Sequence, residues 1–185
     1  MLPLWFVLPI SSFILTYLAG KYLYPKIKHW SHKSIEFWDI ATSCYTAFSI
    51  GSNNVANASG ILSGAGLMSN SAATFMIAPF FGVGGYLLGD GNLESMGKKV
   101  TNLDMVSAGF VSLVTGTLLI SASLIGLPQS LVQLNAFSIF GFGLSQKGRG
   151  SQKLGINIIK KSLAVWIFSP ILAFGISILL TRITG

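Results

Sequence analysis

The sequence of 185 residues has few charged side chains, one cysteine and two histidines. Asp, Glu, Lys and Arg make up only 9% of the chain, whereas they make up about 25% of an ordinary soluble domain. A single cysteine, Cys44, excludes an intramolecular disulfide and a thiolate metal cluster, and we expect it to pack among apolar neighbours. His29 and His32 lie together in a basic segment, and no acidic pair lies in an apolar run. We therefore predict that the protein is not an enzyme.

Long uncharged runs are abundant, and 51% of the residues are hydrophobic. The runs cover residues 2–20, 40–89, 105–146 and 162–181. A helix needs about 20 apolar residues to cross a bilayer, so the second and third runs can each hold two helices. We predict an all-α membrane protein with about six transmembrane segments. No basic residues precede the first run and no small-residue cleavage pattern follows it, so we expect a retained helix instead of a signal peptide.

The basic residues are confined almost entirely to three connecting segments. Eleven of the 12 Lys and Arg residues lie in residues 21–33, 98–99 and 147–161, and Arg182 is the other. If the spans alternate, these segments share one side of the membrane, which the positive-inside rule identifies as the cytoplasm. We therefore expect a multi-pass protein of the plasma membrane with both termini outside. The charge also favours contact with anionic lipid headgroups over binding to nucleic acid.

The octapeptide GSNNVANA, residues 51–58, places three carboxamides and a glycine in the longest uncharged run. Carboxamides at membrane depth are costly unless they are hydrogen-bonded or bind a ligand. Helix propensity also falls at this point, so Gly51 is predicted to break the helix, as in transporters whose discontinuous helices line a binding site. An alternative is that Asn53, Asn54 and Asn57 only join helices by hydrogen bonds.

A second interruption reads GLPQS and begins at Gly126. Gly126 and Pro128 are predicted to end one helix and begin the next, because proline fits the first turn of a helix. The new helix would start at Gln129 with exposed N–H groups and the positive end of its dipole, which attract anions. Ser130 and Gln133 would share one face of its first turns. Alternatively, these two side chains only cap and solvate the helix end.

With both interruptions, the sequence resembles the inorganic phosphate transporters and their sulfate-permease relatives. The family motif Gly-Ala/Ser-Asn-Asp-Val-Ala-Asn-Ala matches GSNNVANA at seven of eight positions. A second family element, Gly-Leu/Ile-Pro-Val-Ser-Thr-Thr-His, matches GLPQSLVQ, residues 126–133, only at its glycine, leucine, proline and serine positions. The segment MGKKVT, residues 96–101, and the closing span from Lys160 to Pro170 are also similar to family elements. The resemblance covers roughly residues 35–180.

The resemblance implies one inverted-repeat half of a transporter, the C-terminal one. Residues 1–34 would form a leading transmembrane helix and a basic cytoplasmic loop, and residues 35–185 the repeat. Inverted-repeat carriers bind substrate where the repeats meet, so the partner is a second half, either a separately encoded subunit or a second copy of this chain. Because the basic bias disfavours insertion in both orientations, we expect a separate subunit first.

The same resemblance implies which residues bind. The substrate-binding residues would be Ser52, Asn53, Asn54, Asn57, Ser130 and Gln133, and the coupling-ion residues would be Asn53, Asn54 and Asn57. The implied activity is secondary active transport of inorganic phosphate, with sodium or a proton as the coupling ion and no other metal or cofactor.

Asn54 is the most consequential departure from the family motif, which has Asp at this position. A carboxylate could ligate sodium or accept the proton of hydrogen phosphate, whereas Asn54 offers only a neutral carbonyl oxygen. Sulfate carries no proton at neutral pH, so a site of donors alone suits it, and sulfate transport is the alternative function. A third possible function is that of a non-transporting regulatory or structural subunit, because Leu131, Val132 and Gln133 replace the family's Thr-Thr-His.

Overall fold

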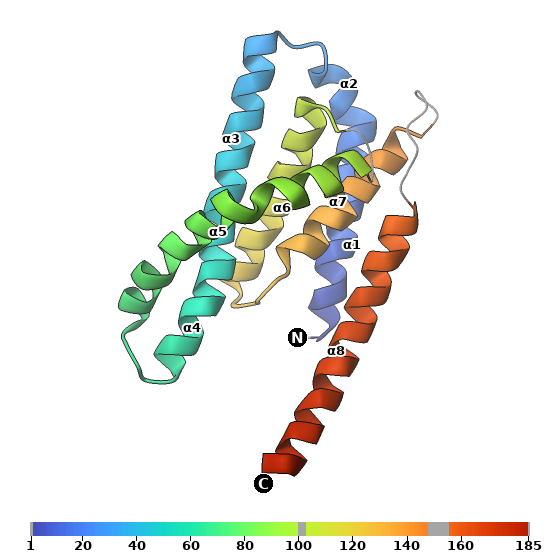
Figure 1. Cartoon of the computed structure of the whole chain (residues 1–185). Coiled ribbons are helices and arrows are strands. Elements are labelled where there is room, and N and C mark those ends of the chain that lie inside the picture. Colours follow the sequence, from blue (N-terminus) through green and yellow to red (C-terminus); the bar gives the residue numbers. More distant parts are fainter. Residues whose placement is uncertain (1, 100–102, 148–155, 185) are drawn as a thin grey trace. The chain divides into compact units, whose positions relative to one another are not determined.

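The computed structural model describes residues 2–99, 103–147 and 156–184 (Figure 1). The described residues form helices joined by short connections, and no strand occurs among them, which confirms the predicted all-α fold. In chain order the elements are α1 (Leu2–Leu18), the π-helical turn η1 (Ala19–Leu23), α2 (Tyr24–Ile27), α3 (His32–Ile50), the π-helical turn η2 (Gly51–Val55), α4 (Ala56–Gly64), α5 (Asn70–Lys99), α6 (Met105–Leu124), α7 (Leu131–Ser145) and α8 (Ile156–Thr184). The chain forms two compact units, Met1–Leu154 and Gly155–Gly185.

Three of the described helical segments are long and apolar enough to cross a membrane: Phe6–Ile27, Met105–Leu124 and Leu163–Arg182. Helix α7 is apolar but has 15 residues, so it extends only about 22 Å along its axis, less than the roughly 30 Å core of a bilayer. Helices α3, α4 and α5 cover the second uncharged run and extend beyond both of its ends, and they are less apolar than α6. The polar motif lies among these less apolar helices.

Helix α6 lies at the centre of the larger unit, where it packs against α3, α1 and α7 (Figure 1). Glycines on α6 allow α3 to approach closely. A Cβ atom at Gly109 would collide with the ring of Trp38, and one at Gly116 would lie 2.9 Å from the ring of Tyr45. The indole Nε1 of Trp38 donates to the carbonyl of Val106 at 3.3 Å. The aromatic side chains of α3 therefore fill the surface that these glycines leave open.

A cluster of buried hydroxyls joins α1, α6 and α7. Its members are Ser12 and Thr16 on α1, Thr115 on α6 and Ser138 on α7, and all are fully buried. The Ser12 hydroxyl donates to the carbonyl of Leu134 at 2.9 Å, and the Thr16 and Ser138 hydroxyls lie 3.0 Å apart. Hydrogen bonds of this kind contribute about 0.6 kcal/mol each inside a membrane, and here they fix how α1 lies along α7.

Gly141 of α7 is expected to tolerate no larger side chain. A Cβ atom there would collide with the backbone carbonyl of Phe13 on α1, and backbone cannot move aside as a flexible side chain can. We expect Gly141→Ala to lower stability by about 1–3 kcal/mol through overpacking, which outweighs the better helix propensity of alanine. Thermal unfolding in detergent measures this.

The matched control is Gly175→Ala on α8, because a Cβ atom at Gly175 meets nothing within 4 Å. We expect its melting temperature to be unchanged or slightly raised. If Gly141→Ala melted like the control, α1 and α7 would lie farther apart than the structure places them.

Helix α1 packs along α7 within the larger unit, and the division of the chain at residue 34 into a leading helix with its loop and a repeat stays a prediction. Cys44 is exposed within the described structure, so the expectation that it packs is wrong. Residues 148–155 of the third basic segment and residues 100–101 of the MGKKVT segment lie outside the described residues.

Candidate functional site

The GSNNVANA motif lies on a helix that changes its winding without breaking. Gly51 has φ −57° and ψ −47°, which are ordinary helical values, and residues Gly51–Val55 form the turn η2 between α3 and α4. The predicted break at Gly51 is therefore wrong, although a backbone irregularity lies at the predicted place. Isolated π-helical turns within α-helices occur frequently at functional sites.

Asn53 is the residue of η2 that contacts the second interruption. Its side chain is only 3% exposed. Its Nδ2 donates to the carbonyl of Leu127 at 3.0 Å, and its Oδ1 accepts the backbone N–H of Gln129 at 3.1 Å. These two backbone groups flank Pro128, which has no N–H of its own. Because one partner can only accept and the other can only donate, the orientation of the Asn53 amide is fixed.

Two further contacts complete the hydrogen bonding of Asn53. Its Nδ2 also donates to the Ser123 hydroxyl at 3.1 Å, and its Oδ1 accepts from the Asn57 amide at 3.4 Å. Both donors and both acceptor positions of the Asn53 amide are therefore in use. We call this set of contacts between Asn53, Ser123 and the linker 125–130 the Asn53 bridge. In this conformation Asn53 joins two segments of the fold and has no hydrogen-bonding position left for a ligand.

The linker begins where the sequence predicted a break and ends later than predicted. Helix α6 ends at Leu124, and Gly126 has φ +67°, which favours glycine, so the break predicted at Gly126 is confirmed. Pro128 lies in the linker and not in the first turn of a helix. Helix α7 begins at Leu131, two residues later than predicted, and Ser130 is its N-cap.

The remaining candidate residues surround the Asn53 bridge or follow it along the chain. Ser52 is half-buried and donates to the carbonyl of Ser49 at 2.9 Å. Asn54 is half-buried and makes no side-chain hydrogen bond among the described residues, and Asn57 is exposed. The Ser130 hydroxyl accepts the N–H of Gln133 at 3.4 Å, the geometry of a helix cap. Gln133 is half-buried.

Sequence analysis missed that η2 and the linker hold each other together. The available signal was the backbone around Pro128: a linker between two helices leaves the Leu127 carbonyl and the Gln129 N–H without helical partners, and buried backbone groups need partners. A buried amide is the simplest side chain that satisfies both a donor and an acceptor. Sequence alone did not indicate which of the three asparagines would do so.

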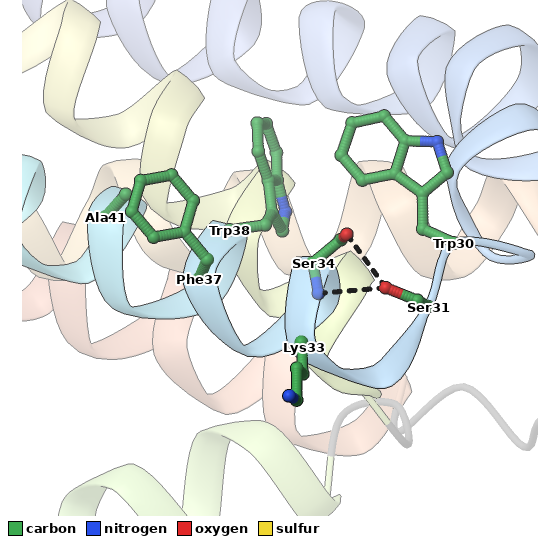
Figure 2. A pocket seen from close by; sticks show the side chains of 7 residues that line it. All are labelled: Trp30, Ser31, Lys33, Ser34, Phe37, Trp38 and Ala41. Carbon is green, nitrogen blue, oxygen red and sulfur yellow. Dashed lines mark hydrogen bonds between the residues drawn. The ribbon is translucent and has the colours of Figure 1, made fainter.

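A separate groove lies at the opposite end of α3. It has a volume of about 690 Å³ and is lined by Trp30, Ser31, Lys33, Ser34, Phe37, Trp38 and Ala41 (Figure 2). Ser31 caps α3 by accepting the N–H of Ser34 at 3.4 Å. Tryptophan beside lysine is typical of a membrane–water interface. Asn53 lies 12 residues beyond Ala41, about 18 Å along a helix, so this groove is distinct from the Asn53 bridge.

The phosphate transporter family matches this chain over residues 19–177, beginning earlier than the sequence resemblance at residue 35. The chain is 36% identical to sulfate permease CysP of Bacillus subtilis, over 97% of this chain and 51% of the permease. It is 29% identical to the chloroplastic inorganic phosphate transporter 2-1 of Arabidopsis thaliana, over 81% of this chain and 27% of that protein. No solved structure matches the chain.

The chain therefore spans about half the length of the sulfate permease and about a quarter of the plant transporter. The family match covers both interruptions, η2 and the linker before α7, as well as the closing helix up to residue 177. Together with the all-helical structure and its apolar spans, the match shows that this chain is a membrane protein that belongs to the phosphate transporter family.

Proposed function

We propose that the chain is one half of a secondary transporter that moves inorganic phosphate across the plasma membrane, coupled to sodium or a proton. The Asn53 bridge is the observation that carries this proposal, because it brings η2 and the linker before α7 into one polar region of an apolar bundle. A buried polar region in a transmembrane bundle is most often part of a substrate or ion pathway. Membership of the phosphate transporter family supports the same function.

The polar region carries no formal charge, so dipoles would hold the anion. No Lys, Arg, Asp or Glu occurs in residues 40–89 or 105–146. The side chains of Asn54 and Gln133 make no hydrogen bond among the described residues, and Asn57 makes one long bond. The first turn of α7 adds backbone N–H groups and the positive end of a helix dipole. These groups are donors of the kind that an oxyanion requires.

The coupling ion would need oxygen ligands if it is sodium. Of the three predicted ligands, Asn53 is the weakest candidate, because its Oδ1 already accepts the Gln129 N–H and the Asn57 amide. Asn54 and Asn57 therefore carry this part of the proposal. Neither is charged, so further oxygen ligands from the second half would have to complete the ion site.

Sulfate is the second candidate substrate, and Asn54 favours it. A half-buried neutral amide in place of a carboxylate removes repulsion of a dianion and removes an acceptor for the proton of hydrogen phosphate. The sulfate permease CysP, which is similar over nearly the whole of this chain, supports the same candidate. Phosphate and sulfate are both tetrahedral oxyanions, so one polar region can accept either.

The exposed face of α4 supports a requirement for a second half. Asn57 is exposed, and Gly60 and Gly64 have open space around an added Cβ atom. A polar side chain beside glycines is suited to close contact with another helix and poorly suited to lipid. We propose that a complementary half covers this face, as a separately encoded subunit or a second copy of the chain.

Uptake into membrane vesicles tests the function. Radiolabelled phosphate and sulfate are offered to vesicles that contain the chain with its native partners, with and without a sodium or proton gradient. Uptake that needs the chain and rises with a gradient supports secondary transport. Vesicles that take up neither anion, although the chain is inserted, would leave the non-transporting subunit as the function.

Topology provides a separate prediction. In a Cys44→Ser background, needed because Cys44 is exposed, we expect Arg182→Cys to react with an impermeant thiol reagent added outside the cell. Lys28→Cys should react only after permeabilisation, because its basic segment is expected in the cytoplasm. Labelling of Lys28→Cys from outside would overturn the orientation. A constant fraction labelled from each side would instead indicate a dimer of oppositely oriented copies.

A further inference from the structure

Gln129 is buried without a hydrogen-bond partner for its side chain. It is 3% exposed, and neither Nε2 nor Oε1 has a partner among the described residues. Buried polar groups in native proteins are nearly always hydrogen-bonded, and each exception calls for an explanation. Burying an unpaired amide costs free energy. Methionine or leucine, which have a similar size and no amide, would avoid this cost at the same position.

Another buried glutamine shows that this fold can satisfy such a side chain. Gln146 is 8% exposed, and its Nε2 donates to the carbonyl of Gly20 at 2.9 Å and to the Ser145 hydroxyl at 3.0 Å. Gln146 therefore acts as a structural link between η1 and the end of α7. Gln129 has no comparable link, so helix packing does not account for its amide.

The backbone of Gln129 lies at the edge of the polar region. It lies between Pro128 and the N-cap Ser130, directly before α7 begins. Its backbone N–H is held by the Oδ1 of Asn53 at 3.1 Å, so the Asn53 bridge fixes the origin of the side chain.

We propose that Gln129 binds the transported anion and selects for hydrogen phosphate. This inference rests on the proposed function. The unpaired Nε2 can donate to an oxygen of the anion, and the unpaired Oε1 can accept the proton of its P–OH group. Hydrogen phosphate satisfies both atoms, whereas sulfate, which has no proton, satisfies only Nε2. Both atoms are covered in the described conformation, so the anion reaches them when the linker or a neighbouring helix moves.

The test is Gln129→Met, which keeps the size of the side chain and removes both polar atoms. Binding of radiolabelled phosphate and sulfate is measured on the full chain with its native partners, in detergent and in vesicles. We expect phosphate binding to weaken about tenfold or more, and sulfate binding to weaken less, because the variant loses two hydrogen bonds to phosphate and one to sulfate. The melting temperature should hold or rise, because an unpaired buried amide has been removed.

Gln146→Met is the matched control. It should lower the melting temperature, because it removes hydrogen bonds to Gly20 and Ser145, and leave the preference between the two anions unchanged. Unchanged phosphate binding in Gln129→Met would overturn the inference, and so would equal weakening of both anions. A wild-type protein that binds phosphate but does not transport it would overturn the proposed function alone. A wild-type protein that binds neither anion would overturn both.

Discussion

Replacing Asn53 with alanine should abolish uptake and lower the melting temperature, because four hydrogen bonds end on this one side chain. Without it the carbonyl of Leu127 and the N–H of Gln129 stay buried with no partner next to a proline. A buried unpaired backbone group costs about 1–3 kcal/mol, so we expect a loss of about 2–4 kcal/mol. Thermal unfolding and vesicle uptake measure the two effects.

Asn57→Ala separates the structural role from transport. Asn57 is exposed and makes one hydrogen bond, at 3.4 Å, to Asn53, so its loss should change stability by less than about 0.5 kcal/mol. We still expect it to abolish uptake, because Asn57 is a proposed substrate and ion ligand. If Asn53→Ala melted like the wild type, the Asn53 bridge would not hold the linker. If Asn57→Ala transported normally, Asn57 would serve only in helix contacts.

The second large effect is expected at Asn54, where a carboxylate replaces the amide. In Asn54→Asp, sulfate uptake should fall through like-charge repulsion at a half-buried position. We expect about 1–3 kcal/mol, equivalent to about 5- to 150-fold in affinity. Phosphate uptake should hold or rise, because the carboxylate can accept the proton of hydrogen phosphate or bind sodium. The measurement is uptake of each anion with and without sodium.

Asn54→Ala is the control for the loss of the amide alone. It removes the neutral side chain without adding charge. We therefore expect it to change the uptake of phosphate and of sulfate to a similar extent, unlike Asn54→Asp. Equal loss of both anions in Asn54→Asp would show that position 54 does not distinguish sulfate from phosphate. The choice of substrate could then not be attributed to this position.

Asn54 and Gln129 affect the substrate in opposite directions. The neutral Asn54 favours the fully ionised sulfate, whereas the donor and acceptor of Gln129 match hydrogen phosphate. The positions also differ in setting, because Asn54 is half-buried on η2 and Gln129 is buried in the linker. Measuring both variants with both anions therefore shows which position sets the preference.

The sequence alone was sufficient for the features that depend on neighbouring residues. Uncharged runs predicted helices because an apolar chain in a membrane must satisfy its backbone internally. The pair Gly126 and Pro128 predicted the end of α6, because glycine accepts a positive φ and proline lacks an N–H. The GSNNVANA motif predicted a helix break at Gly51, where the structure has a π-helical turn instead, and its match to a family motif indicated the family.

Tertiary structure decided the features that depend on distant partners. Whether the helix at Gly51 breaks or takes a π-helical turn cannot be read from propensity, because the sequence around it fits either. Asn53 finds Leu127 and Gln129 at separations of 74 and 76 residues, and no local pattern specifies which of three asparagines faces them. Whether the side-chain amide of Gln129 has a hydrogen-bond partner depends on where the neighbouring donors and acceptors lie in the folded chain. Hydrogen bonds across the bundle depend on which faces of α3 and α6 meet, and packing determines that contact.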